Sequence, residues 1–323
     1  MFEIPAVEER QGVHIIDTQH TGERGTVGCF VLASRQDDSF LMVESGPGST
    51  LDTVLAGIER AGFAPEQLAA LLVTHIHLDH AGAAGALLER APKARLYVHE
   101  RGAKHMADPS RLLESAKRIY QDDMEYLWGD MLPVPQERIV ALSGDEELEI
   151  LGHRIQVTYT PGHASHQVAY YFNEDVLFTG DAAGAKVPNS NVVRPTLPPP
   201  EVNLELYDES LERLASLGAR RLMLTHFGEV MHPQKHFAEI AKANHAWAQA
   251  VLVGLQAGED DEALVARLDA LNREELAADG ASEELIAQHK AISNDVMSVA
   301  GIKRYWQKHH PERLLPTASP ARG

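Results

Sequence analysis

The stretch Thr74-His75-Ile76-His77-Leu78-Asp79-His80-Ala81-Gly82 decides the fold that we expect for this chain. The apolar run 68–73 before it reads as a buried strand, and the segment 81–90 after it reads as a helix. The stretch is therefore predicted to lie on a loop at the carboxyl end of a strand, where α/β proteins place their chemistry. Its side chains that can bind a metal ion are His75, His77, Asp79 and His80.

The spacing within this stretch indicates a pair of metal ions rather than one. Imidazole and carboxylate groups together suit zinc, iron or manganese. In the alternation His-x-His-x-Asp-His, successive side chains can point to different sides of a small volume. A pair of ions would need further ligands from elsewhere in the chain.

Three more segments supply such ligands. His163 follows the strand-like run 155–159, and His226 follows the strand-like run 222–224. Asp181 also comes directly after an apolar run. Metal-type side chains therefore recur at strand ends, which a random scatter of His and Asp would not do.

The ordered combination resembles the metallo-β-lactamase superfamily, whose members build a dinuclear centre from these motifs. The resemblance spans roughly residues 10–230 and implies an α/β fold, the αββα sandwich. Carried over residue by residue, it implies a first metal position held by His75, His77 and His163. It implies a second position held by Asp79, His80 and His226, with Asp181 bridging the two. The cofactor expected is two divalent metal ions per chain, zinc foremost, with iron or manganese as alternatives.

Several further segments narrow the resemblance. Residues 98–102, the stretch 110–128 and the surroundings of His163 and His226 look like a group of mostly uncharacterised prokaryotic hydrolases. That group is similar to glyoxalase II and the acyl-homoserine lactonases. Lactonases of this superfamily use a tyrosine from the loop after the bridging aspartate. This chain has no tyrosine between Asp181 and Tyr207, which argues against a close lactonase.

Hydrolysis is the chemistry that this centre implies. Metal coordination lowers the pKa of water from about 15.7 toward roughly 7, so a hydroxide bridging the metals can form near neutral pH. We therefore expect an enzyme that opens an ester, thioester or lactone bond of a small molecule, with Asp79 as the catalytic residue that orients the nucleophile. The alternatives are a phosphodiesterase on a small phosphate ester and an iron-dependent redox enzyme of the sulfur dioxygenase type on the same fold.

Weaker candidates surround the predicted ligands. His166 follows His163 by three residues and would orient a ligand or touch substrate. Arg194 lies in the long loop predicted for 186–203, where it would pair with a substrate carboxylate or form a surface salt bridge. The residues that directly precede a ligand and could fix it by hydrogen bonds are Thr74 and Thr225, with Thr160 near His163.

Composition limits the partners and the location. The 29 Lys and Arg residues against 47 Asp and Glu give a net charge of −18, which argues against nucleic acid as a partner because that affinity depends on neutralising phosphates. The amino terminus shows no secretion signal, and no apolar run is long enough to span a membrane. The single cysteine, Cys29, cannot form an internal disulfide. We therefore expect a cytoplasmic enzyme with a small-molecule substrate and no membrane partner.

The chain divides into three predicted regions: a catalytic domain at 1–233, a helical appendage at 234–313 and a flexible tail at 314–323. Apolar residues at helical spacing predict helices at 236–255, 261–271 and 282–306. This appendage offers surface for a homodimer. A helical stretch at 109–131 is predicted to form a lid or a wall over the metals.

Overall fold

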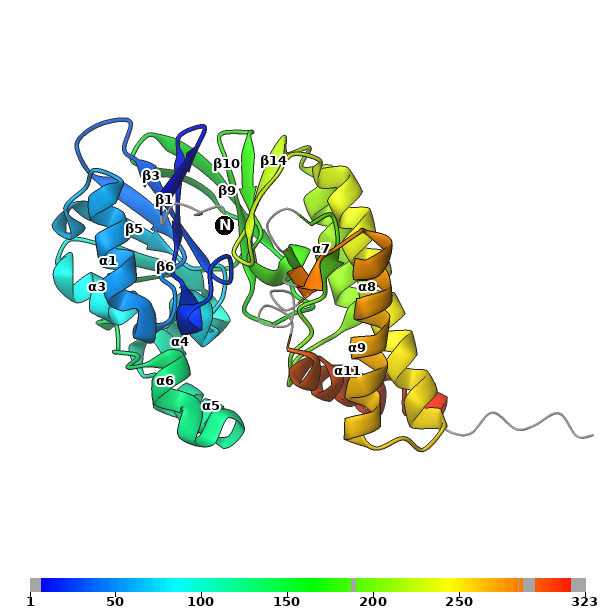
Figure 1. The fold of residues 1–323 in the computed structure, drawn as a ribbon. Coiled ribbons are helices and arrows are strands. Elements are labelled where there is room, and N and C mark those ends of the chain that lie inside the picture. Colours follow the sequence, from blue (N-terminus) through cyan, green and yellow to red (C-terminus); the bar gives the residue numbers. More distant parts are fainter. Residues whose placement is uncertain (1–6, 187–189, 284, 287–293, 315–323) are drawn as a thin grey trace, which may run out of the picture.

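Two β-sheets pack face to face, and helices cover the outer face of each (Figure 1). The computed structural model describes residues 7–186, 190–283, 285–286 and 294–314. The four layers, helices, sheet, sheet and helices, confirm the predicted αββα fold class. The predicted tail, apart from Leu314, lies outside the described residues.

The first sheet has seven described strands in chain order. The strands β1 to β4 are antiparallel, and β4 to β7 are parallel, since α-helices connect them on one side. The bounds are β1 Val7–Arg10, β2 Val13–Asp17, β3 Gly28–Ala33, β4 Phe40–Val43, β5 Leu68–Leu72, β6 Arg95–His99 and β7 Ile139–Leu142.

The second sheet has six described strands in the order β15-β14-β11-β10-β9-β8. All neighbours are antiparallel except β11 and β14, so β9, β11 and β14 run in the same direction. The bounds are β8 Glu147–Ile150, β9 His153–Tyr159, β10 Val168–Phe172, β11 Val176–Phe178, β14 Arg221–Leu224 and β15 Gly228–Val230.

A hydrophobic core fills the space between the sheets. The rings of Phe30 and Phe172 meet that of Phe178 edge to face, at centroid distances of 5.2 and 5.1 Å. All three side chains are buried, and burying one such side chain contributes about 1.5–3 kcal/mol. This core fixes the two sheets relative to each other, and with them the loops at their ends.

Short helices cover the first sheet: α1 Leu51–Arg60, α2 Leu78–Ala81, α3 Ala84–Arg90, α4 Glu100–Ala107, α5 Ser110–Tyr120 and α6 Met124–Trp128. The helical stretch predicted at 109–131 is two helices, because Gln121 between them has a φ of 47° that an α-helix cannot accommodate. In Figure 1, α5 and α6 lie together at the lower left of the molecule.

Longer helices cover the second sheet: α7 Leu204–Ser216, α8 Pro233–Gln256, α9 Asp261–Ala278 and α11 Asp295–His309. Trp247 of α8 and Trp306 of α11 share one buried cluster with Leu222 and Leu224 of β14. The helical region therefore shares a core with the second sheet. None of the helices in the described part of the chain is long and apolar enough to cross a membrane.

Helix is present at the start of the range predicted at 282–306, where residues 283, 285 and 286 are helical and the Leu285 N–H donates to the Ser282 hydroxyl at 3.2 Å, but a second helix begins within that range. The Asn294 side chain accepts a hydrogen bond from the Met297 backbone N–H at 3.1 Å and caps a helix that starts at Asp295. Residues 287–293 lie outside the described part of the chain.

Candidate metal centre

The predicted ligand side chains meet at one end of the sandwich. Strands β9, β11 and β14 run in the same direction, so the residues that follow them emerge at the same edge. His163 follows β9, Asp181 lies in the short 3-10 turn Gly180–Ala183 after β11, and His226 follows β14. The β5 segment joins this edge through a hydrogen bond of 2.8 Å from the Val168 N–H to the Thr74 carbonyl.

The first motif is split between a loop and a helix. His75 and His77 lie on the loop after β5, as expected, but Asp79 and His80 lie in helix α2. His77 has extended backbone dihedrals and directly precedes that helix. The rings of His75 and His80 nevertheless lie close together, at a centroid distance of 3.9 Å, so the two halves of the motif meet at one site.

Three imidazole rings form the first group, which consists of His75, His77 and His163. The Nδ1 atom of His77 lies 2.9 Å from Nε2 of His75 and 3.0 Å from Nε2 of His163. One nitrogen of each ring thus points to a common centre, and these atoms lie within 4.8 Å of one another.

The second group consists of Asp79, His80 and His226. The Oδ2 atom of Asp79 lies 3.7 Å from Nε2 of His80 and 3.3 Å from Nε2 of His226. Both histidines are buried, whereas the Asp79 side chain is 21% exposed. Asp79 is therefore the member of this group that solvent reaches.

Asp181 stands between the two groups. Its Oδ1 atom lies 3.2 Å from Nε2 of His80 and 3.4 Å from Nε2 of His226. Its Oδ2 atom lies 3.4 Å from Nε2 of His163, in the first group. Each carboxylate oxygen thus faces a different group, which is the arrangement of a bridging ligand.

The electrostatics of these residues suit cations. Burial lowers the pKa of His75 and His77, and the neighbouring imidazoles lower it further, so these rings are neutral and can donate a lone pair. Burial opposes ionisation of Asp79 and Asp181, yet the surrounding histidines hold the pKa of both carboxyls below the usual range. Neutral imidazoles and ionised carboxylates are the forms that bind metals. The same carboxylates raise the pKa of His80 and His226 despite their burial, so these two rings would release a proton when a cation binds.

Unpartnered polar atoms also indicate a bound cation. In the described part of the chain, the buried Nε2 of His80 and the buried Oδ1 of Asp181 lie 3.2 Å apart, but neither makes a well-aligned hydrogen bond. Burying such an atom without a partner costs about 1–3 kcal/mol. Divalent metal ions at the two groups would satisfy both atoms, so the residues present fit them.

Glu44, which follows β4, contacts His80 of the second group and was not predicted from the sequence. It is fully buried, and its Oε1 lies 2.9 Å from Nδ1 of His80. Thr74 donates to both of its oxygens through its N–H and its hydroxyl, and the Thr225 hydroxyl donates to Oε1 at 3.2 Å. The two threonines therefore act on His80 through Glu44. The hydroxyl of Thr160, the third threonine expected to help, is buried without a described partner.

Backbone carbonyls orient two other rings. The Nδ1 atom of His163 lies 2.8 Å from the Thr196 carbonyl oxygen, and Nδ1 of His226 lies 2.7 Å from that of Thr26. Each of these nitrogens therefore carries the proton, which leaves Nε2 free to bind a metal.

His166 and Arg194 differ from each other in location. His166 accepts a hydrogen bond from the Ile76 N–H at 3.4 Å, and its ring centroid lies 5.5 Å from that of His77. Burial lowers its pKa to about 3, so it borders the first group as a neutral ring. Arg194 is buried, and its guanidinium lies against Glu275 and Asn272 of helix α9. It is neither open to a substrate nor part of a surface salt bridge.

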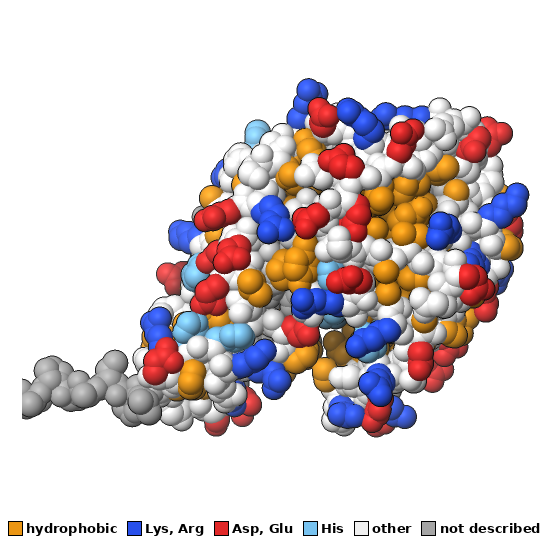
Figure 2. Space-filling model, turned by 180° about the vertical axis from the view of Figure 1, so that it is seen from behind, with side chains coloured by type: hydrophobic (Ala, Val, Ile, Leu, Met, Phe, Trp, Pro, Cys, Tyr) orange, Lys and Arg blue, Asp and Glu red, His pale blue; other side chains and the backbone are white. Residues whose placement is uncertain are grey.

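The α5–α6 stretch lies beside the second group. Burial and the nearby Asp79 carboxylate raise the pKa of Tyr120 to about 12, so its phenol keeps its proton. The Tyr120 ring meets that of Trp128 at 5.0 Å, and Trp128 stacks on His20 at 5.2 Å. Of these rings, Tyr120 is the one that lies near Asp79. Seen from behind, the surface is hollowed between two lower lobes, with basic and histidine side chains around the hollow (Figure 2).

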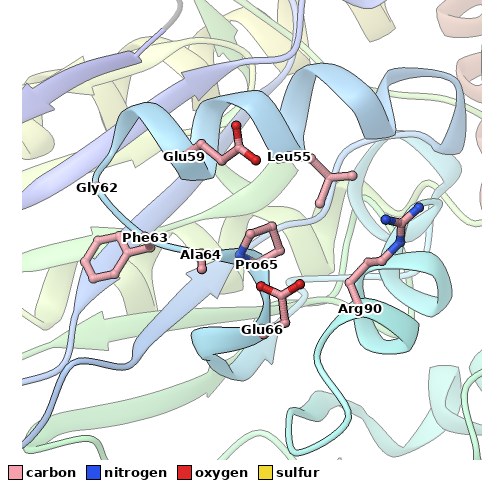
Figure 3. Close-up of a pocket in the computed structure, with 8 residues that line it drawn as sticks. All are labelled: Leu55, Glu59, Gly62, Phe63, Ala64, Pro65, Glu66 and Arg90. Carbon is pink, nitrogen blue, oxygen red and sulfur yellow. The ribbon is translucent and has the colours of Figure 1, made fainter.

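A separate pocket lies outside this centre (Figure 3). It is formed by helix α1, the turn that follows it and the end of α3, and none of the predicted metal ligands lines it. Its apolar members include Leu55, Phe63 and Pro65, and its charged members are Glu59, Glu66 and Arg90.

Comparisons with known proteins agree with this geometry. A family model described as the metallo-beta-lactamase superfamily matches residues 23–226. The metallo-beta-lactamase fold-containing protein ST1585 of Sulfurisphaera tokodaii is 34% identical over 169 residues, 51% of this chain and 62% of that protein. A hydroxyacylglutathione hydrolase of a Synechococcus strain is 31% identical over 116 residues, 36% of this chain and 34% of that protein. The chain thus matches less than two thirds of the length of either relative.

Solved structures extend the likeness beyond the sandwich. The archaeal ST1585 structure from Sulfolobus tokodaii has a TM-score of 0.60 at 28% identity and covers 73% of this chain and 87% of that one. The metallo-beta-lactamase family protein TTHA1429 from Thermus thermophilus has a TM-score of 0.61 at 20% identity and covers 93% and 94%. The second likeness shows the fold alone, but it extends into the C-terminal helices. With its family model matched over more than half of its length, the chain belongs to the metallo-β-lactamase superfamily.

Proposed function

We propose that this protein is a hydrolase that uses two divalent cations, most readily zinc, to open an ester, thioester or lactone bond of a small molecule. The observation that carries the proposal is the position of Asp181, whose two carboxylate oxygens face two separate groups of nitrogen atoms. A site for one cation would not need a carboxylate shared in this way.

The residues around the cations have distinct roles in this proposal. His75, His77 and His163 would hold one cation, and Asp79, His80 and His226 would hold the other. When bound, the cations would lower the pKa of water toward about 7 and polarise the carbonyl oxygen of the substrate.

Asp79 would orient the attacking water. Its carboxyl is ionised and partly open to solvent, so it can accept a hydrogen bond from a water molecule in the site. Glu44 and the carbonyls of Thr26 and Thr196 would hold the rings in place, so that no ligand has to reorganise during the reaction. The relatives named hydroxyacylglutathione hydrolases favour an acyl group as the reacting part of the substrate.

Elemental analysis of protein purified without added metal, combined with a substrate screen, tests the proposal. The screen contains aryl esters, lactones, thioesters and bis-aryl phosphates. About two cations per chain with turnover of a carboxyl ester, thioester or lactone is the expected result. Turnover of the phosphate diester alone would replace the proposal with the phosphodiesterase. One iron per chain, with oxygen consumption and no hydrolysis, would replace it with the redox enzyme.

A further inference from the structure

The segment after Asp181 connects the candidate metal centre to the C-terminal helices. It contains two short paired strands, β12 Ala185–Lys186 and β13 Val193–Arg194, with Ala185 opposite Arg194. On the metal side, the Lys186 N–H donates to the His226 carbonyl at 2.5 Å, and the Phe227 N–H donates to the Lys186 carbonyl at 3.0 Å. The position of β12 therefore fixes the backbone at His226.

Thr196, two residues after Arg194, extends this support to the other ligands. Its carbonyl oxygen lies 2.8 Å from Nδ1 of His163, and its hydroxyl donates to the Asp181 carbonyl at 3.0 Å. A shift of this segment would therefore move groups that contact His163, Asp181 and His226 together. These residues belong to both metal positions and to the bridge between them.

On its other side, the segment is held by helix α9. The Arg194 side chain is 1% exposed, and its guanidinium donates to Glu275 Oε2 at 2.7 Å and to the Asn272 carbonyl at 3.2 Å. The Asn191 N–H donates to the Asp279 carboxylate at 3.1 Å. Each of these acceptors belongs to α9 or directly follows it.

Helix α11 closes the same segment by close backbone packing. A Cβ atom built at Gly301 of α11 would lie only 2.0 Å from the Leu197 carbonyl oxygen. Only glycine allows this approach, because any side chain at that position would displace Leu197 or the helix. The loop is therefore held on one face by α9 and α11 and touches the metal ligands on the other.

A gain in the stability of the fold does not explain why Arg194 is buried with a charged partner. Removing an ion pair from water costs about as much as the attraction between the charges returns, so such a pair adds little net stability. It does, however, fix the relative position of the two elements that it joins, since an unpaired buried charge is strongly unfavourable.

We propose that Arg194, through its ion pair with Glu275, is a positioning residue that holds strand β13 and the residues up to Leu197 against the metal centre, so that helix α9 sets the cation affinity of the site. This inference rests on the proposed function. It assigns the C-terminal helices a role in the metal centre although none of the predicted ligands lies in them.

Cation affinity of full-length variants tests the inference. Zinc affinity is measured by competition with a chromophoric chelator, and the absorption spectrum of the cobalt(II)-substituted protein reports the geometry of the ligands. Arg194→Met is expected to weaken zinc binding by about 10- to 100-fold and to change the cobalt spectrum. Arg194→Lys, which keeps a positive charge beside Glu275, is expected to recover part of the loss. The control is Arg273→Met, which removes an exposed arginine of α9 that pairs with Asp269, and it should bind like the wild type.

A folded Arg194→Met variant with wild-type zinc affinity and cobalt spectrum would overturn the inference. Should that variant fail to fold, Glu275→Gln decides instead, because the amide oxygen still accepts a hydrogen bond from the Arg194 guanidinium and the Glu275 side chain is 34% exposed. Weakened zinc binding in Glu275→Gln then supports the inference, and unchanged binding overturns it. Wild-type protein that binds neither zinc nor cobalt would instead overturn the proposed function, and this inference with it.

Discussion

The two sides of the candidate metal centre are held in place by different means. On the side of the first motif, the side chain of Glu44 fixes His80 and is itself fixed by Thr74 and Thr225. On the opposite side, backbone carbonyls fix His163 and His226. The position of His80 therefore depends on the Glu44 side chain, which mutation can remove. The positions of His163 and His226 depend on backbone carbonyls, which mutation can move only by shifting the loops that carry them.

This difference follows from the fold. Glu44 directly follows β4, which lies beside β5 in the same sheet, so its carboxylate reaches the loop that follows β5. His163 and His226 follow β9 and β14 of the second sheet, and the Nδ1 atom of each meets a backbone carbonyl from another connection, that of Thr196 and that of Thr26. In our proposal, helix α9 holds the connection that contains Thr196 through its contacts with Arg194.

The change with the largest expected effect removes Asp181, the residue that contacts both ligand groups. Asp181→Ala should lower turnover by on the order of 10³-fold or more, because the loss of a metal costs several kcal/mol of transition-state stabilisation. Metal content should fall below two per chain while the circular dichroism spectrum stays that of a folded protein. Turnover at the wild-type rate in Asp181→Ala would contradict the bridging role.

Metal removal tests whether bound cations stabilise the folded protein. A ligand present at about 1,000 times its dissociation constant stabilises the folded state by about 4 kcal/mol, so excess chelator should lower the melting temperature by several degrees. Added zinc should restore it. An identical melting curve with and without chelator would show that the cations do not contribute to stability.

Glu44→Gln changes only the side chain that holds His80, on the side of the first motif. The amide keeps the shape of Glu44 but removes the charge that faces His80. We expect zinc to bind about 10- to 100-fold more weakly, with the loss confined to the second position. Titration of the metal-free variant with cobalt should then show two unequal steps. Two steps of wild-type affinity would contradict the role of Glu44.

Thr196→Ala has the smallest expected effect and separates the role of the Thr196 side chain from that of its carbonyl. It removes the hydroxyl that bonds to the Asp181 carbonyl but keeps the carbonyl oxygen that faces His163. Stability should fall by about 1 kcal/mol, the usual net contribution of one hydrogen bond, with turnover nearly unchanged. Chemical denaturation and steady-state kinetics measure the two quantities. A loss of turnover as large as that in Glu44→Gln would show that the Thr196 side chain matters more than its carbonyl.

The sequence predicted the fold class, and the side chains that it predicted as ligands lie together in the structure, because both kinds of signal are local. Each candidate ligand lies within four residues after a strand or within the first motif, where the pattern of apolar residues and the residue type can be read together. Glu44 also follows a strand, in Val43-Glu44-Ser45-Gly46, but a single glutamate without a second ligand beside it gives no signal.

Other contacts left no local trace in the sequence. The carbonyls of Thr26 and Thr196 act through the backbone, which every residue possesses. Arg194 and Glu275 are far apart in the chain, and only the packing of α9 brings them together. The start of α11 could have been predicted, since Asn294 before Asp295 is typical of a helix N-cap.

Anomalous X-ray scattering at the zinc edge, from crystals of protein loaded with zinc, would test the central claim most directly. We predict two peaks of electron density about 3.5–4 Å apart, one on each side of the Asp181 carboxylate. A single peak bound by His75, His77 and His163 at full zinc loading, with no density near Asp79, His80 and His226, would contradict the dinuclear centre.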